Sequence, residues 1–148
     1  MNSPQINADE RRSEEDYIHE ALTEKIIGVF YDVYNVLGHG FLESVYHNAM
    51  ALALRDGGLA VESKPRIPVY FRGQLVGEFE ADLVVEGKIL LELKAARELD
   101  PAHEAQTLNY LRATSIEVGL LMNFGPKPKF RRLAFANDRK RRQSGPSF

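Results

Sequence analysis

An acidic residue and a lysine stand two positions apart in a very apolar stretch of the sequence, as Glu92 and Lys94. Side chains alternate along a β-strand, so this pair would share one face while Leu91 and Leu93 point to the other. Two charged groups on such a strand are costly to bury unless something binds them. Asp82, in the preceding apolar stretch, is out of place in the same way. These residues are candidates for chemistry, although Glu-x-Lys alone is common and an exposed charge pair is the ordinary alternative.

Whether Asp82 meets Glu92 depends on the turn between their strands, for which Glu86-Gly87-Lys88 is a hairpin signal. If these three residues form the loop, Val85 pairs with Ile89, and Asp82 lies opposite Glu92 on the same face. A two- or four-residue loop would put the two carboxylates on opposite faces. Two facing carboxylates need a cation or a shared proton, and such oxygen ligands suit Mg²⁺ or Mn²⁺. A metal site therefore predicts an odd-length loop or a compensating bulge.

Helices are predicted before and after these strands. Apolar residues at three- and four-residue steps predict helices over 16–37 and 41–56, separated by Gly38-His39-Gly40. Strands are predicted over 60–71, 75–85, 89–95, 118–123 and 130–135, and the fourth is apolar enough to be buried on both faces. Pro65 and Pro68 favour an edge strand or a bent one. Asp100 and Pro101 predict the start of a helix that ends near residue 113.

Length and composition fit one compact domain, since the chain has 148 residues, of which 44% are hydrophobic and 27% charged. The absence of cysteine excludes disulfides and thiolate metal sites and favours a reducing compartment, so we expect a cytoplasmic protein. No apolar run is long enough for a membrane span, and the polar N-terminus does not resemble a secretory signal. We expect a disordered arm over residues 1–15, the domain over 16–136 and a basic tail over 137–148.

Charge is distributed unevenly along the chain. Residues 125–148 contain eight basic residues and one acidic residue, whereas the remainder contains 11 basic and 20 acidic residues. A basic end on an acidic body favours an anionic partner for that end. The alternative is a solvated tail, or one that pairs with the acidic body of the same chain. The candidates for contact with an anionic partner are Lys127, Lys129, Arg131 and Arg132.

The hairpin that carries Asp82, Glu92 and Lys94, with a helix before it and a helix and strand after it, resembles the core of the PD-(D/E)XK nuclease superfamily. The resemblance implies an α/β fold with a restriction-endonuclease-like αβββαβ core, a mixed sheet flanked by helices. It also implies that Asp82 and Glu92 bind a metal ion and that Lys94 assists the attack of water on a phosphodiester. Ala81 stands where the name of the superfamily has proline, at a position that varies within it.

Two further segments resemble narrower groups of this superfamily. The segment from Gly40 to Tyr46 is similar to the signature of the GxxExxY proteins, which implies that Glu43 completes the metal site. Without this resemblance, Glu43 would be read as a first-turn acid that favours the helix dipole, and Tyr46 is expected to be a packing residue. Gln106 and Tyr110 share a helix face and resemble the Q-x-x-x-Y element of RecB-like nucleases, which implies that Gln106 supports the active site, with Tyr110 as an accessory residue.

These observations predict a Mg²⁺- or Mn²⁺-dependent nuclease that hydrolyses nucleic acid, with DNA favoured over RNA. The alternative is a non-catalytic nucleic-acid-binding or regulatory module that keeps the nuclease fold, since the acidic body would repel a duplex. Such a module would need a protein partner or a homo-oligomer. Hydrolysis of a small phosphorylated ligand is a third interpretation, and it predicts a closed pocket around Lys94. Fold analogy does not decide among them, because function belongs to the site.

Overall fold

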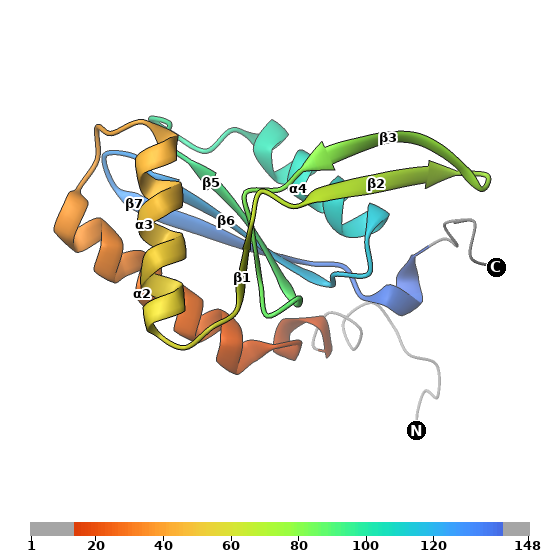
Figure 1. Ribbon diagram of the computed structural model, residues 1–148, viewed down its shortest axis with the longest axis horizontal. Coiled ribbons are helices and arrows are strands. Elements are labelled where there is room, and N and C mark those ends of the chain that lie inside the picture. The colour runs from red at the N-terminus through yellow and green to blue at the C-terminus, as the bar shows by residue number, and fades with distance from the viewer. Residues whose placement is uncertain (1–13, 141–148) are drawn as a thin grey trace, which may run out of the picture.

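The computed structural model describes residues 14–140, and the N-terminal arm up to residue 13 and the tail from residue 141 lie outside the described residues. A five-stranded sheet has helices on both faces, and a separate two-stranded hairpin extends from it (Figure 1). The elements in chain order are α2 (Glu20–Leu37), α3 (Glu43–Asp56), β1 (Val61–Ser63), β2 (Arg66–Phe71), β3 (Gln74–Glu80), β4 (Leu83–Val85), β5 (Ile89–Lys94), α4 (Pro101–Ala113), β6 (Val118–Phe124), β7 (Pro128–Ala134) and the 3₁₀ helix η1 (Asn137–Arg139).

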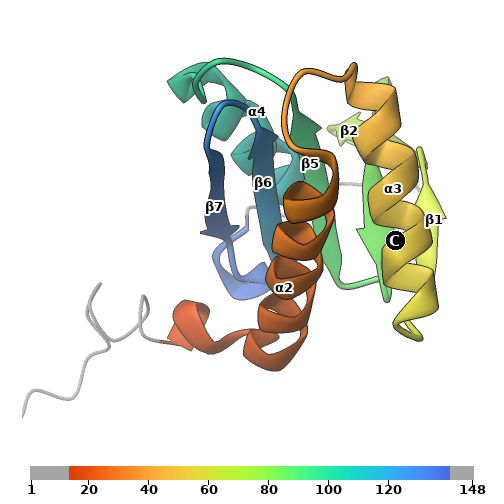
Figure 2. The same cartoon turned by 90° about the vertical axis from the view of Figure 1, so that its left-hand side faces the viewer.

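The strand order of the main sheet is β1-β4-β5-β6-β7, with β5 and β6 parallel and the other neighbours antiparallel. The expected mixed sheet flanked by helices is thus confirmed. The parallel pair is joined by α4, which begins as expected with Asp100 as its cap and Pro101 in its first turn. All seven residues of β6 are buried, because helices cover both faces of the sheet there. Figure 2 shows α2 and α3 on one face and α4 on the other.

Two of the expected strands are each divided in two, so the structure has two more strands than expected. The segments 61–71 and 74–85 form one long antiparallel hairpin that bends where Lys64 and Pro65 face Ala81 and Asp82. Lys64 has a positive φ of 52°, and the prolines that favoured a bent strand account for the bend. Beyond it, β2 and β3 leave the main sheet as an arm. The bend places Asp82 at the start of β4.

The core has two parts, one on each face of the sheet. The larger lies between α2, α3 and the sheet and includes Phe30, Met50 and Leu91. The smaller lies under α4 and includes Leu90 and Leu111. Because Leu90 and Leu91 are adjacent on β5, their side chains alternate between the two parts of the core. No helix within residues 14–140 is long and apolar enough to cross a membrane.

The helix expected over 16–37 is interrupted near its start, since residues 14–17 are helical, residues 18 and 19 form a turn, and α2 begins at Glu20. His19 has a positive φ of 55°, and the carbonyl groups of Glu15 and Ile18 accept hydrogen bonds from Arg132. Carbonyls that would continue the helical ladder are thus bound by β7. Glu15 is buried and pairs with Arg139 at 2.7 Å, so both residues belong to the packed domain, beyond the expected limits of 16–136.

Candidate metal and active site

Asp82 and Glu92 face each other at the ends of β4 and β5. The register pairs Val85 with Ile89, so the three-residue loop expected from the sequence is confirmed. The N–H of Asp82 donates to Oε2 of Glu92 (3.0 Å), and the N–H of Leu93 donates to Oδ2 of Asp82 (2.7 Å). Each carboxyl group therefore binds the backbone of the opposite strand through one oxygen. The hairpin register brings together the two acids that the sequence analysis singled out.

Burial disfavours the ionised form of both carboxyl groups in this pair. Glu92 is 6% exposed, and burial, followed by the charge of Asp82, raises its pKa from an ordinary value of 4.5 to about 7. Burial also raises the pKa of Asp82, while its bond from Leu93 acts in the opposite direction. Lys94, half-buried at the end of β5, lowers the pKa of both acids. A bound cation would relieve the remaining repulsion and desolvation.

Glu43 reaches the same place from α3. It is the first residue of that helix, and the N–H of Ala95 donates to its Oε2 at 3.4 Å, so its carboxylate lies beside the end of β5. Tyr46 fixes the turn that leads into the helix, since its hydroxyl donates to the Gly38 carbonyl (2.7 Å) and accepts from the Phe41 N–H (3.2 Å). Tyr46 is fully buried. Its contact with the site is therefore indirect, through the position of Glu43.

Gln106 and Tyr110 lie on α4 next to the acid pair. Burial and the charge of Glu92 raise the pKa of Tyr110, and an interaction with the Gln106 side chain acts in the opposite direction. The Tyr110 ring stacks on Phe79 of the arm, with 3.7 Å between centroids and 3° between planes. The two helix residues therefore connect the arm to the site.

His47 was not singled out in the sequence, although it lies one helical turn after Glu43. It lines a hollow of about 230 Å³ together with Glu43, Asp82 and Lys64. Its Nε2 is 2.7 Å from the Ser63 hydroxyl, whereas its buried Nδ1 has no hydrogen-bond partner among residues 14–140. Burial lowers the pKa of His47, against the effect of Asp82. The lowered pKa favours a neutral imidazole in the lining of this hollow, beside Glu43 and Asp82.

The donor set fits a divalent cation. Within the described residues no three acidic or histidine side chains converge as a formed cage. However, Asp82 and Glu92 each commit one oxygen to a backbone N–H, so the second oxygen of each is left for a ligand. Oxygen donors from carboxylates match the preferences of Mg²⁺ and Mn²⁺.

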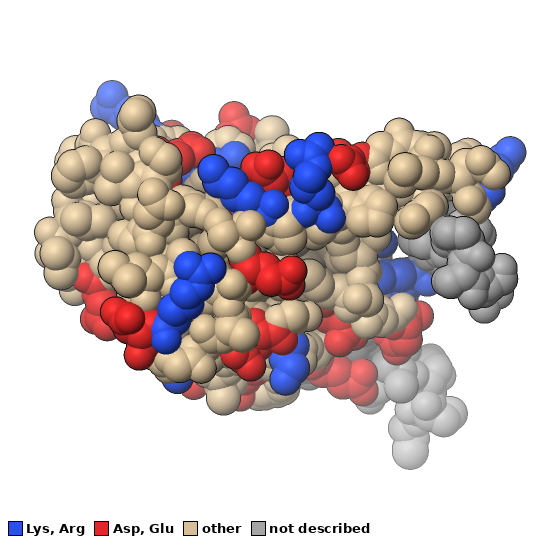
Figure 3. Space-filling model, viewed as in Figure 1, with Lys and Arg blue, Asp and Glu red and all other residues tan. Residues whose placement is uncertain are grey.

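The four basic residues expected to meet an anionic partner have different surroundings. Arg132 is half-buried and donates to two backbone carbonyls, and Arg131 pairs with Glu104 at 3.5 Å. Lys127 and Lys129 are exposed and line a hollow beside the β6–β7 turn. Figure 3 shows basic and acidic side chains interspersed on one face of the molecule, without a large area of one sign.

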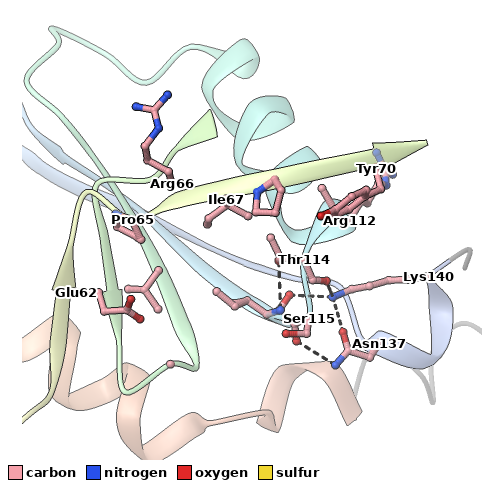
Figure 4. Close-up of a pocket in the computed structure, with 15 residues that line it drawn as sticks. Glu62, Pro65, Arg66, Ile67, Tyr70, Arg112, Thr114, Ser115, Asn137 and Lys140 are labelled. Carbon is pink, nitrogen blue, oxygen red and sulfur yellow. Dashed lines mark hydrogen bonds between the residues drawn. The ribbon is translucent and has the colours of Figure 1, made fainter. Parts of the chain in front are cut away.

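A third, larger hollow of about 870 Å³ lies under β2 (Figure 4). Lys140 lines it, and its ammonium group donates to the carbonyls of Thr114 (2.8 Å) and Ile116 (2.9 Å). This lysine of the expected basic tail is thus used within the fold. None of the predicted site residues lines this hollow.

The chain is similar in sequence to one protein family and in fold to a solved structure. A family model described as the PD-(D/E)XK nuclease superfamily matches residues 20–133. No curated protein matches the sequence. A solved structure described as "Crystal structure of SSO0001" is similar with a TM-score of 0.50 and 20% identity. The match covers 82% of this chain and 62% of that one, so this chain spans less than two thirds of its length. At such identity the likeness concerns the fold alone. Because the family match covers well over half of the sequence, the chain belongs to the PD-(D/E)XK nuclease superfamily.

Proposed function

We propose that this protein is a magnesium- or manganese-dependent nuclease that hydrolyses phosphodiester bonds, with DNA as its first expected substrate. Membership of the superfamily supports a nuclease-type function. The observation that carries the proposal is the buried pair of Asp82 and Glu92, with its reciprocal backbone bonds and the adjacent Lys94. A protein without need of a cation would gain little from keeping two acids there.

Glu43, Asp82 and Glu92 are the proposed metal ligands. When bound, the ion supplies a Lewis acid that polarises a phosphate oxygen and makes water more acidic. The hydrogen bonds to Asp82 N–H and Leu93 N–H hold the two hairpin carboxylates in place before any ligand arrives. Such fixed positions remove part of the cost of reorganisation during the reaction.

Lys94 is proposed to act on the phosphodiester directly. Its ammonium group shares a face with Glu92 and is close enough to affect the pKa values of both hairpin acids. There it would orient the water that attacks phosphorus and stabilise the negative charge that develops on the phosphoryl oxygens. Gln106 would hold Tyr110 and, through its stack on Phe79, the arm against the site.

Narrower assignments follow from the sequence. The segment Gly40 to Tyr46 supports placement among the GxxExxY proteins, because Glu43 lies beside the end of β5. The absence of cysteine supports a cytoplasmic location. The protein would engage nucleic acid as a homo-oligomer or with a protein partner, since its acidic body would otherwise repel the nucleic acid.

Cleavage by variants tests the nuclease. Asp82→Asn and Lys94→Ala should abolish Mg²⁺-dependent cleavage of labelled DNA and RNA while leaving the fold intact by circular dichroism. Lys88→Ala is the matched control, because this lysine is exposed on the loop at the other end of β5. Equal cleavage by the wild type and either site variant would show that the site is wrongly assigned.

A non-catalytic module is the second candidate, and the 20 acidic residues outside positions 125–148 favour it, because this acidic body would repel a duplex. Titration calorimetry with Mg²⁺ and Mn²⁺, beside Asp82→Asn, separates the two. Metal binding that is lost in the variant, without turnover of single- or double-stranded DNA or RNA, would favour the module.

A further inference from the structure

Two loops at the end of the sheet are locked together. The side chain of Asn123, at the end of β6, accepts from the Ala96 N–H and donates to the Ala96 carbonyl, both at 2.9 Å. Asn123 is 1% exposed. A Cβ on Gly125 would lie 2.3 Å from the same carbonyl, so only glycine permits this approach. The β5–α4 loop and the β6–β7 turn therefore have a fixed relative position.

α2 holds the turn from the other side. The hydroxyl of Tyr34 lies 2.7 Å from the Gly125 carbonyl and 2.9 Å from that of Pro126, close enough to donate to either. The Tyr34 ring also stacks on Phe124, with centroids 6.4 Å apart. The backbone of this turn is therefore held rigidly, which lowers the entropic cost when its side chains bind a ligand.

Three exposed basic residues surround the clamped loops. Arg97, Lys127 and Lys129 line a hollow of about 370 Å³, with Glu98 as the one acidic residue in its lining. Within residues 14–140, none of the three cationic side chains forms a hydrogen bond or an ion pair. This separates them from the other basic residues nearby in sequence, Arg131, Arg132, Arg139 and Lys140, whose groups are bound within the fold.

The sheet register places this hollow near the proposed catalytic lysine. Lys94 pairs with Asn123 on β6, and Asn123 pairs with Lys129 on β7, so the three side chains share one face. Two strand spacings put Lys129 about 10 Å from Lys94 along the sheet. One nucleic acid strand could then place one phosphate at Lys94 and a neighbouring phosphate in the hollow.

We propose that Arg97, Lys127 and Lys129 form a phosphate subsite, which binds an internal phosphate of the nucleic acid strand next to the one at Lys94. This inference rests on the proposed function and adds how the strand is positioned. Arg97 binds phosphate through a planar fork, and the lysines act as point charges. Glu98 opposes binding and reduces the affinity. Asn123 and Gly125 are positioning residues that hold the two loops together.

Binding without turnover tests the subsite directly. The full chain is titrated in EDTA against a fluorescent single-stranded oligonucleotide at several salt concentrations, and anisotropy gives the affinity. Replacing all three cationic residues with glutamine should weaken binding. It should also make the negative slope of log K against log salt shallower by about 0.7, the value for one phosphate on a single strand. Lys88→Gln should leave the slope unchanged, and Glu98→Gln should tighten binding. All these residues are exposed, so the fold should survive.

The outcomes also separate the subsite from the nuclease. Binding by the wild type with an unchanged slope in the triple variant overturns the subsite, whether or not the protein cleaves. A reduced slope without cleavage in Mg²⁺ supports the subsite and refutes the nuclease. No binding by the wild type in EDTA overturns the subsite, while cleavage in Mg²⁺ tests the nuclease separately. A variant effect confined to oligonucleotides with a 5′-phosphate would show recognition of a strand end, and this too overturns the internal-phosphate assignment.

Discussion

Replacing Glu92 with glutamine should stabilise the metal-free protein at neutral pH and at the same time abolish cleavage. The folded protein raises the pKa of Glu92 from 4.5 to about 7, first because the carboxyl group is buried and second because Asp82 is charged. At a pH between these two pKa values, Glu92 is protonated in the folded state and ionised in the unfolded state. The free energy of unfolding therefore falls as pH rises through this window and levels off above it.

The size of this effect follows from the two pKa values. One pKa unit corresponds to about 1.4 kcal/mol, so ionised Glu92 costs the folded state about 3 kcal/mol at pH 8. Glutamine avoids this cost, and its side-chain oxygen can still accept from the Asp82 N–H. For a domain of this size the variant should melt about 10 °C higher than the wild type in EDTA at pH 8.

Urea denaturation from pH 4.5 to 8 in EDTA measures the effect. The wild type should lose stability across the range, and Glu92→Gln should not. Glu62→Gln, at an exposed carboxyl group on β1, is the matched control and should behave as the wild type. Adding Mg²⁺ should stabilise the wild type more than the variant, because a ligand of the folded state shifts unfolding by mass action. The argument would be refuted if the free energy of unfolding of the wild type did not change with pH, or if Glu92→Gln were less stable than the wild type at pH 8.

Three other substitutions test how the site is supported. Arg132→Gln should lower the free energy of unfolding by about 1.5–3 kcal/mol, since charged hydrogen bonds to backbone carbonyls are lost; an altered salt slope of nucleic acid binding would contradict this structural role. Asn123→Asp removes the donor to the Ala96 carbonyl and should cost about 1–3 kcal/mol in urea denaturation, with weaker oligonucleotide binding. Phe79→Ala should release the arm from Tyr110 and speed amide exchange over residues 66–80, whereas unchanged protection would show that the stack does not anchor it.

Local patterns in the sequence predicted much of the fold. The three-residue loop at 86–88 sets the register of β4 and β5, and the side-chain period of two then places Asp82 opposite Glu92. Asp100 and Pro101 determine where α4 begins. The continuous apolar run of β6 predicted burial on both faces. Each of these features depends on residues close together in the chain.

Other features depend on contacts between distant segments. The start of α2 is moved by Arg132, more than a hundred positions away, and charge alone made that residue a candidate for contact with phosphate. His47 became a candidate only when Asp82 and Ser63 were found around it. Arg97 and Lys129 gave no joint signal in the sequence, because the clamp at Asn123 brings their loops together.

The sequence by itself determined most of the elements, the central hairpin register and which acids face each other, because turn length and side-chain alternation are local properties. Only the tertiary structure decided which charges remain available. A lysine or arginine is equally charged anywhere in the sequence, but burial and backbone carbonyls occupy Arg132 and Lys140 while Lys127 and Lys129 stay exposed. The raised pKa of Glu92 has the same origin, since desolvation exists only once the sheet and helices close around the carboxyl group.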